Sequence, residues 1–478
     1  MQTIEKKSTK KAWAGALAQP ASEFPLTPLP VIAGKIPEGL RGTLYRNGPG
    51  RLERGEMRVG HWFDGDGAIL AVHFTDAGAK GVYRYVQTEE YKAESIANKY
   101  LYAGFGYNNL EMAWKTLNQQ IKNPANISVL ALPDKLLALW DASCPYALDL
   151  QTLETKGLDY LGALTKNLPY SAHYKRDPLT GEIYNFGVSV LGGIKLNLYR
   201  SDRTGKIIQK NAFPLDRYSI IHDFVITNRY LIFFIPPLKL KLLPVLFGLS
   251  DFSRSFDWKP NLGTQILIFD RQTLSLVSRG ETDPWFYWHF GNAGENPDGS
   301  ISLDVVRYAD FDQTNEFLRE VPTGETQTVA KGTLWQMQIN PQTAKVITQE
   351  EVVSRKCEFP VVAQSQVGQP WRYTYFSLIG ENVDIKQELF GAIARFDYQT
   401  HTLTEADLGK NRYGTEPIHA QDKHNTEQGW LLTVVYDGNT HSSEVWIYDS
   451  DRLKDEPVCK LELPNVIPHG YHGTWKPA

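Results

Sequence analysis

The sequence has few of the residues that define several common classes of protein. Its 478 residues include three cysteines, an odd number, and no two of them form a C-x-x-C pair. We therefore expect neither a disulfide framework nor a thiolate zinc site, and a reducing compartment fits best. Basic residues do not exceed acidic ones, and the net charge is -4. Because a general nucleic-acid binder needs a basic surface, we expect no nucleic-acid partner.

Long apolar runs are also absent, at the N-terminus as elsewhere. Basic residues there precede a short apolar stretch at 12–18, which is too short and too poor in leucine for a signal peptide. We expect residues 1–22 to form a mobile arm. No low-complexity linker divides the remaining chain, so residues 23–478 are predicted to form one domain.

The most apolar segment, 236–249, reads PPLKLKLLPVLFGL and is interrupted by Lys239, Lys241 and Pro244. A membrane-spanning helix needs about 20 apolar residues without such breaks. An interfacial patch fits better, with the lysines at the lipid headgroups. Its membrane-facing residues would be Leu238, Leu242, Leu243, Leu246 and Phe247. A buried helix or strand pair is the alternative.

Helical patterns are scarce, and short runs rich in β-branched and aromatic residues recur, as at 135–140, 230–234, 265–269, 372–376 and 430–436. Several are joined by turns with an Asp or Asn followed by Thr two or three positions later, at 149–152, 177–181, 202–205, 270–273, 340–343 and 397–400. Asp and Asn stabilise such turns through hydrogen bonds to the backbone. An all-β fold follows. A propeller, with blades of about 40–50 residues and longer loops inserted, is favoured over a barrel or sandwich.

Four of the eleven histidines stand in or beside apolar, aromatic runs next to a turn: His173, His222, His289 and His472. They are spread over most of the chain, which suits a ring of blades in which inner strands each deliver one ligand to the central axis. Neutral imidazole binds iron, zinc or copper. Composition and spacing do not choose among these metals.

Two stretches near the N-terminus, IPEGLRGTLYRNGPG at 36–50 and HWFDGDG at 61–67, resemble the opening of carotenoid cleavage oxygenases. The contexts of His222, His289 and His472 resemble ligand positions of that family. The resemblance implies a seven-bladed β-propeller with inserted loops and with short helices that cap the metal face. It also implies one Fe(II) per chain on the central axis and O2 as co-substrate. The implied reaction is cleavage of a C=C bond of a carotenoid or apocarotenoid to two carbonyl products.

By the same resemblance the iron ligands, and hence the catalytic set, are His173, His222, His289 and His472, whereas His61 and His469 are structural. The family orients its ligands with three glutamates, and Glu358 and Glu416 match two of them. Asp141 stands at the third position, one methylene shorter, so we expect it to reach its histidine only through a shift or a water. Chain order pairs Asp141 with His222, Glu358 with His289, and Glu416 with His472.

The resemblance also suggests residues around the substrate. Ile127 stands where the family often has Thr, and its bulk would block one coordination position of the metal. Trp140 and Trp288 adjoin a carboxylate and a ligand, so we expect them to line the substrate tunnel. The family uses a patch near 236–249 to enter membranes and admit lipophilic substrate, which implies a cytoplasmic protein peripherally associated with a membrane. The sequence leaves the oligomeric state open, with a monomer as the simplest case.

Three other functions remain to be weighed. Stilbene-type cleavage of a phenylpropanoid would use the same iron site. Stilbene-cleaving relatives, however, carry Lys at the position just before the carboxylate, and Trp140 stands at that position here. A metal-dependent isomerase or hydrolase of the retinoid type is the second. A non-catalytic propeller that binds a partner, with purely structural histidines, is the third, and a metal assay separates it from the enzyme.

Overall fold

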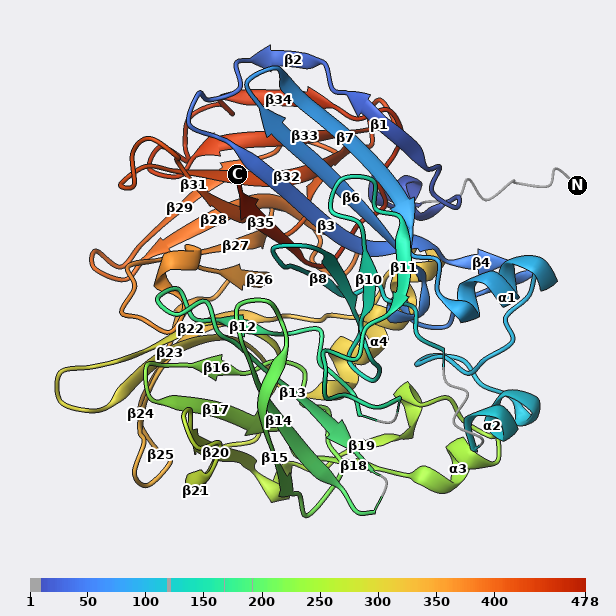
Figure 1. Cartoon of the computed structure of the whole chain (residues 1–478), viewed down its shortest axis with the longest axis vertical. Coiled ribbons are helices and arrows are strands. Elements are labelled where there is room, and N and C mark those ends of the chain that lie inside the picture. The colour runs from blue at the N-terminus through green and yellow to red at the C-terminus, as the bar shows by residue number, and fades with distance from the viewer. Residues whose placement is uncertain (1–9, 118–121, 167, 191) are drawn as a thin grey trace, which may run out of the picture.

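The computed structural model describes residues 10–117, 122–166, 168–190 and 192–478, and shows a seven-bladed β-propeller (Figure 1). Seven antiparallel sheets of four or more strands are present among these residues. The predicted all-β class and propeller architecture are therefore confirmed. Strands that are buried on both faces read as continuous apolar runs, as at 136–139 and 230–235.

Both ends of the chain close the ring. Blade 1 has the order β35 (Gly473–Pro477), β3 (Gly42–Arg51), β6 (Asp66–Thr75), β7 (Gly78–Tyr85) and β1 (Phe24–Pro28). The C-terminal strand β35 is thus innermost in the blade built from N-terminal strands, with Arg46 opposite Gly473. The N-terminal strand β2 (Val31–Gly34) pairs with β34 (Cys459–Glu462) at the edge of blade 7. These two pairings hold the first and last blades together.

The other blades follow in chain order, each from its inner to its outer strand. Blade 2 contains β8 (Ser128–Ala131), β9 (Leu136–Leu139), β10 (Tyr146–Leu148) and β11 (Thr155–Leu158). Blade 3 contains β12 (Lys175–Arg176), β13 (Ile183–Ser189), β14 (Lys195–Ser201) and β15 (Ile207–Pro214). Blade 4 contains β16 (Val225–Ile226), β17 (Tyr230–Ile235), β20 (Thr264–Asp270) and β21 (Leu276–Thr282).

Blade 5 contains β22 (Phe286–Glu295), β23 (Ile301–Tyr308), β24 (Thr333–Asn340) and β25 (Lys345–Val353). Blade 6 contains β26 (Cys357–Val361), β27 (Tyr373–Ile379), β28 (Phe390–Asp397) and β29 (Thr402–Asp407). In blade 7, β30 (Arg412–Gly414) and β31 (Ile418–Gln421) both pair with β32 (Gly429–Asp437), followed by β33 (Ser442–Asp449) and β34.

The repeated Asp/Asn-to-Thr turns form hairpins within the blades. Five of the six join the two outer strands, and the turn at 177–181 joins β12 to β13. In the turn at 270–273, Asp270 Oδ1 accepts hydrogen bonds from the backbone of Gln272 and Thr273, at 3.1 and 2.7 Å. The next residue, Leu274, has a φ of 56°. The side-chain bonds offset the strain of this left-handed conformation.

Insertions between strands carry two short hairpins and all the helices except the first 3-10 helix, which precedes the first strand. The α-helices are α1 (Glu89–Ala97), α2 (Leu110–Leu117), α3 (Leu242–Leu246) and α4 (Phe311–Glu320). The 3-10 helices are η1 (Ala12–Leu17), η2 (Trp62–Asp64), η3 (Ser253–Ser255), η4 (Pro260–Leu262), η5 (Val321–Thr323) and η6 (Gln364–Gln366). The hairpins pair β4 (Glu53–Arg54) with β5 (Met57–Arg58), and β18 (Leu238–Leu240) with β19 (Phe256–Trp258).

The segment before the propeller differs from the mobile arm expected over 1–22. Residues 1–9 lie outside the described residues, but 12–17 form η1 and pack against the propeller. Trp13 is 0% exposed, and its indole N–H donates to the carbonyl of Gln387 at 2.8 Å. The indole finds both an apolar site and an acceptor far along the chain, which no local pattern reveals.

We expect Trp13→Phe to lower the free energy of unfolding by about 1–2 kcal/mol, because it removes this hydrogen bond and part of a buried ring. Denaturant unfolding measures the change. Leu179 is an exposed apolar residue on a hairpin turn, and Leu179→Ala serves as the control that leaves stability unchanged. An unaltered midpoint for Trp13→Phe would contradict the packing of η1.

Candidate metal centre

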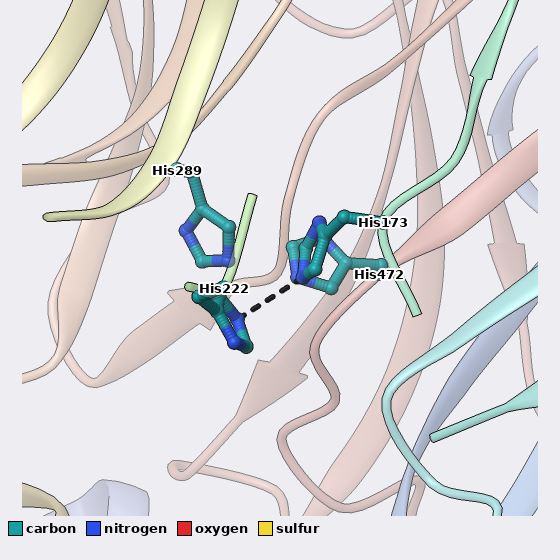
Figure 2. Close-up of side chains that lie close together, drawn as sticks. All are labelled: His173, His222, His289 and His472. Carbon is teal, nitrogen blue, oxygen red and sulfur yellow. Dashed lines mark hydrogen bonds between the residues drawn. The ribbon is translucent and has the colours of Figure 1, made fainter. Parts of the chain in front are cut away.

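The four histidines singled out in the sequence meet at the centre of the ring (Figure 2). One ring nitrogen from each of His173, His222, His289 and His472 lies within 4.8 Å of the other three. The Nε2 atoms of His173 and His222 are 3.0 Å apart. All four side chains are buried. Histidines separated by up to 299 positions in the chain, from 173 to 472, therefore form one compact donor set.

The propeller explains how they meet. His173, His222 and His472 come just before the innermost strands β12, β16 and β35, and His289 lies in the innermost strand β22. The three other blades supply different side chains at their inner strands. Ile127 precedes β8, Glu358 lies in β26, and Glu416 lies between β30 and β31. Each of the seven blades thus contributes one residue to the centre.

Carboxylates hold three of the four imidazoles by their second nitrogen. His222 Nδ1 lies 2.9 Å from Asp141 Oδ2, His289 Nδ1 is 2.5 Å from Glu358 Oε2, and His472 Nδ1 is 2.9 Å from Glu416 Oε1. This is the pairing expected from chain order. An Nδ1–H that donates to a carboxylate leaves Nε2 free to act as an electron-pair donor.

Asp141 reaches His222 directly, which corrects the expectation that the shorter side chain would need a shift or a water. Its other oxygen, Oδ1, accepts from the backbone of Ala172 at 3.0 Å and from the hydroxyl of Ser171 at 3.3 Å. These bonds fix the carboxylate from the chain segment that also carries His173.

His173 differs from the other three because it has no carboxylate within hydrogen-bond distance among the described residues. Its Nδ1 is 3.9 Å from Asp223 Oδ1, and that oxygen pairs with Lys175 Nζ at 2.9 Å. The backbone of His173 is instead held by the Ser171 hydroxyl at 3.0 Å.

Burial and mutual repulsion keep much of this set neutral. Burial, together with the other three imidazoles, lowers the pKa of His173 well below its ordinary value. Burial also lowers the pKa of His472, and Glu416 opposes this only in part. For His289 the attraction of Glu358 outweighs burial and raises the pKa.

Two of these carboxylates, Asp141 and Glu416, favour their charged form. Burial alone would raise the pKa of Asp141 and of Glu416, but His222 and His472 outweigh it, and both values fall. Anions behind electron-pair donors suit a bound cation.

The sequence analysis missed two residues that hold these carboxylates. Arg46, 4% exposed, places Nη1 3.0 Å from Glu416 Oε2 and donates to the carbonyl of Tyr471. Tyr308 donates its hydroxyl to Glu358 Oε1 at 3.0 Å. Arg46 lies within the N-terminal motif at 36–50, and its strand also carries Thr43 and Asn47, so no local signal singled it out.

The donor set fits one transition-metal ion. A histidine nitrogen lies about 2.0–2.1 Å from a bound zinc ion, so opposite ligands of one such ion are about 4 Å apart. The observed span of 4.8 Å is close to that value. His289 Nε2 is buried and has no hydrogen-bond partner among the described residues, although buried polar atoms normally have one.

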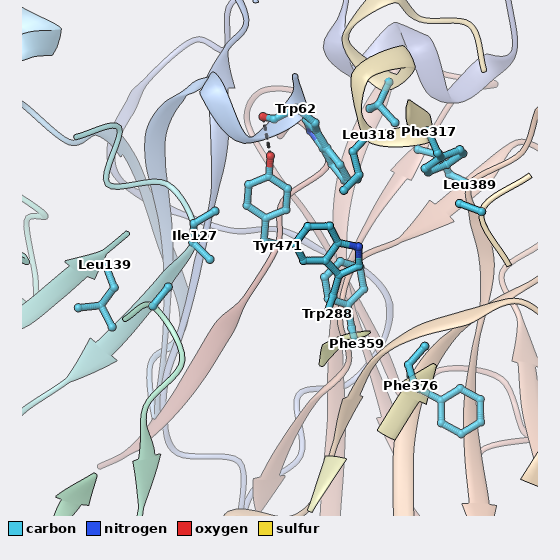
Figure 3. Close-up of a cluster of buried hydrophobic side chains, with 14 of the residues drawn as sticks. Trp62, Ile127, Leu139, Trp288, Phe317, Leu318, Phe359, Phe376, Leu389 and Tyr471 are labelled. Atoms are coloured by element: carbon cyan, nitrogen blue, oxygen red, sulfur yellow. Dashed lines mark hydrogen bonds between the residues drawn. The ribbon is translucent and has the colours of Figure 1, made fainter. Parts of the chain in front are cut away.

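An apolar cavity opens onto one side of the histidines. Ile127, Trp288 and Phe359 line it next to His222, His289 and His472, and Phe317, Leu318 and Leu389 line it further away (Figure 3). Trp62 and Tyr471 complete the wall beside the metal centre, with the Tyr471 hydroxyl donating to the Trp62 carbonyl at 2.6 Å. Part of this wall belongs to η2 and α4, the short elements that cap the centre.

A second, more polar cavity reaches the histidines along the ring axis. Residues from all seven innermost strands or their flanks line it, including Lys175, Asp223, Asn292 and His419. The metal centre therefore separates an apolar side from a polar side.

Of the predicted tunnel residues, Ile127 and Trp288 line the apolar cavity, and the Trp288 ring contacts His222 edge-on at 5.0 Å. Trp140 is half-buried and lines neither of the two cavities described above.

The two histidines expected to be structural lie outside the centre. His61 caps η2 by accepting from the backbone of Phe63, and His469 Nε2 lies 3.0 Å from the carbonyl of Trp13. Neither His61 nor His469 belongs to the four-histidine set.

The predicted membrane patch is partly exposed and partly buried. Leu243 is 68% exposed, and Leu242 and Phe247 are also exposed, but Leu246 is only half-exposed. Leu238 was wrongly assigned to the patch: it is 0% exposed, because β18 pairs with β19 and turns it into the core. Within the described ranges no helix is long and apolar enough to span a bilayer.

The prediction from the sequence did not include three further exposed apolar residues of this surface. Helix α2 packs beside α3 (Figure 1), and its Leu110 and Trp114 are exposed, as is Leu249 after α3. We define the α2–α3 patch by Leu110, Trp114, Leu242, Leu243, Phe247 and Leu249.

A seven-bladed propeller with four histidines on its axis, three of them held by carboxylates, defines the class: a propeller whose centre offers a set of imidazole ligands to a metal ion. The chain belongs to the family of the retinal pigment epithelial membrane protein and the carotenoid cleavage oxygenases, whose model matches residues 17–477. The resemblance inferred from the motifs is therefore confirmed.

Individual relatives point to the same family. The chain is 33% identical to apocarotenoid-15,15′-oxygenase of Synechocystis sp., covering 93% of this chain and 92% of the relative. It is 28% identical to carotenoid 9,10(9′,10′)-cleavage dioxygenase 1 of Pisum sativum, covering 96% and 88%. A structure of a Synechocystis apocarotenoid oxygenase variant matches at a TM-score of 0.89 and 31% identity, and the cobalt-substituted protein at 0.86 and 30%, each covering 98% of both chains.

Proposed function

We propose that this chain is an Fe(II)-dependent dioxygenase that cleaves a C=C bond of a carotenoid or apocarotenoid into two carbonyl products. The observation that carries the proposal is the four-histidine set at the end of an apolar cavity. Relatives named as apocarotenoid and carotenoid cleavage enzymes support the reaction type.

His173, His222, His289 and His472 would hold the iron, one ion per chain. Imidazole ligands alone suit iron, zinc and copper alike, and the cobalt-substituted relative supports a bound transition metal in a protein of this fold. When bound, iron(II) supplies the electrons that O2 needs to react with a double bond, which no side chain can do.

The residues of the chain position the substrate and exclude water. The rings of Phe63, Trp288 and Phe359 surround the imidazoles on the apolar side, with Phe63 parallel to His222 at 6.0 Å. A polyene gains binding energy there from buried area, and the wall fixes which bond lies beside the metal. Ile127, 2% exposed, restricts approach on its side of the centre.

The test is incubation of iron-loaded protein under O2 with intact carotenoids and with apocarotenoids of several lengths, followed by identification of the products. A pair of aldehydes or ketones whose lengths sum to the substrate supports the proposal. Turnover of none of them by protein with full iron occupancy contradicts it.

A partner-binding propeller without catalysis is the second candidate, because propellers often bind partners on their faces. Metal analysis of the purified chain separates the two: one iron per chain supports the enzyme. Stilbene-type cleavage is less well supported, since Trp140 stands where stilbene-cleaving relatives carry lysine.

The α2–α3 patch supports peripheral attachment to a membrane. A carotenoid is almost insoluble in water, so an apolar surface would let it leave a bilayer without crossing solvent. Each leucine or phenylalanine fully buried in lipid contributes roughly 1.5–3 kcal/mol. Four or more exposed apolar side chains are therefore enough for reversible binding.

We expect the triple variant Leu243→Ser, Phe247→Ser, Leu249→Ser to lose binding to liposomes in a sedimentation assay. It should also turn over liposome-borne carotenoid more slowly. The folded structure should persist, because all three side chains are exposed. Leu179→Ser and Val190→Ser, which alter exposed apolar residues elsewhere, form the control. Liposome binding of the triple variant equal to that of the parent refutes the proposal.

We expect Asp141→Asn to lower metal affinity or activity by about 10–100-fold, because an uncharged amide raises the basicity of the His222 imidazole less than a carboxylate does. Asp141→Glu restores the residue typical of the family and should change either quantity much less. Iron content after dialysis against a chelator measures the effect. If Asp141→Glu removes activity while iron stays bound, the assigned role of Asp141 is wrong.

A further inference from the structure

Lys356 lies in the wall of the apolar cavity, beside Phe317. It immediately precedes β26, is 4% exposed, and lines the cavity together with Phe317, Leu389 and Trp288 (Figure 3 shows these three). Its Nζ sits 4.1 Å from the centre of the Phe317 ring. Lysine is almost never fully buried unless it is paired with a carboxylate. A lysine in this wall therefore needs an explanation.

The ammonium group is poorly satisfied. Among the described residues, Nζ has one hydrogen-bond acceptor, the carbonyl of Ile385 at 3.2 Å, and no carboxylate within 4.0 Å. A lysine side chain carries up to three N–H donors, so donors remain unused. Burial without a counter-charge lowers the pKa of Lys356 to about 7. Either protonation state of the amine still carries an unused N–H donor.

We propose that Lys356 Nζ is the hydrogen-bond donor that holds the oxygen-bearing end of a polyene bound in this cavity. The inference deepens the proposed function and rests on it: the preferred substrates are polyenes that end in a carbonyl or hydroxyl group. A hydrocarbon end offers no acceptor and would leave the lysine unsatisfied, which costs binding energy. The rest of the wall is apolar and binds by area alone.

A purely structural role is the alternative, in which Lys356 holds the loop at Ile385. The two roles differ in what they do to substrate preference. An anchor discriminates between polyene ends, whereas a loop support affects all polyenes alike.

The experiment uses the iron-loaded full chain and three polyenes of equal length, ended by an aldehyde, an alcohol or a methyl group. We expect Lys356→Met, which keeps the apolar bulk, to lower the ratio of kcat/KM for the aldehyde or alcohol over the hydrocarbon by about 10-fold or more. Lys356→Gln retains an N–H donor and should recover part of the ratio. If Lys356→Met does not fold, Lys356→Gln takes its place: a ratio below that of the parent supports the anchor, and a ratio equal to that of the parent overturns it.

Two control variants test whether the change in the ratio is specific to Lys356. Lys345→Met changes an exposed lysine and should leave the ratio unaltered. Leu389→Ala removes apolar wall and should weaken all three substrates similarly. Equal losses for all three polyenes in Lys356→Met would overturn the proposal in favour of the structural role.

Binding is measured separately, by quenching of tryptophan fluorescence in the iron-loaded protein without O2. The dissociation constants should show the same preference for oxygenated ends and the same loss in Lys356→Met. If the parent cleaves none of the polyenes, the proposed function fails, but this titration still decides the anchor. Equal affinity for all three ends in the parent overturns it.

Discussion

Replacing His472 by alanine is expected to leave a folded chain that retains no iron and has no cleavage activity. The side chain comes just before β35, at the point where the C-terminal strand closes the ring. Its loss removes one of four donors and leaves Glu416 and Arg46 facing a cavity. Iron analysis after gel filtration, together with turnover of an apocarotenal, measures the effect. The same result is expected for His173→Ala, His222→Ala and His289→Ala.

His469→Ala is the matched control. His469 is a buried imidazole three positions earlier, bonded to the Trp13 carbonyl and outside the donor set. Both substitutions remove the same volume from the same segment. The assignment predicts iron in His469→Ala and none in His472→Ala, and full iron occupancy in His472→Ala would refute it.

Glu416→Ala should show the second large effect, on stability as well as on metal binding. Glu416 accepts from His472 and pairs with Arg46 where both side chains are almost fully buried. Removing one partner leaves an uncompensated guanidinium, at a cost of about 3–5 kcal/mol. Loss of the imidazole's partner should lower metal affinity about 10–100-fold. Denaturant unfolding and chelator competition measure the two quantities.

Glu405→Ala is the control for the stability change. Glu405 pairs with Arg355 at 2.7 Å, but both side chains are partly exposed, and such a surface pair contributes at most about 1 kcal/mol. If Glu416→Ala destabilises the protein no more than Glu405→Ala does, the buried pair does not support the centre. Glu416→Gln, which keeps the shape, should lower metal affinity with a smaller loss of stability.

The predictable part of the fold came from patterns that act locally. Turns such as 270–273 depend on an Asp that bonds to the backbone two and three residues on, so sequence alone locates them. The four histidines were also visible, because an imidazole in an apolar run at a turn needs a partner. Chain order paired Asp141, Glu358 and Glu416 correctly with their histidines, since neighbouring blades follow one another around the ring.

The predictions that were wrong, and the residues that were missed, depended on contacts between distant segments of the chain. Trp13 belongs to the expected mobile arm, yet it is buried because Gln387 and His469, far along the chain, provide its partners. Leu238 was expected on the surface but is buried by pairing with β19. Arg46 and Lys356 gave no clear signal, because the partners that give them meaning lie in other blades or in the cavity.

The sequence by itself determined the β-rich class, the repeating hairpins and the identity of the four histidines, since these follow from local propensity and residue chemistry. Only the tertiary structure decided that Asp141 reaches His222 directly, that α2 joins α3 in one apolar patch, and that Lys356 faces the cavity of the metal centre. The physical reason is that closing a ring of blades sets distances between residues hundreds of positions apart, and hydrogen bonding and burial depend on those distances.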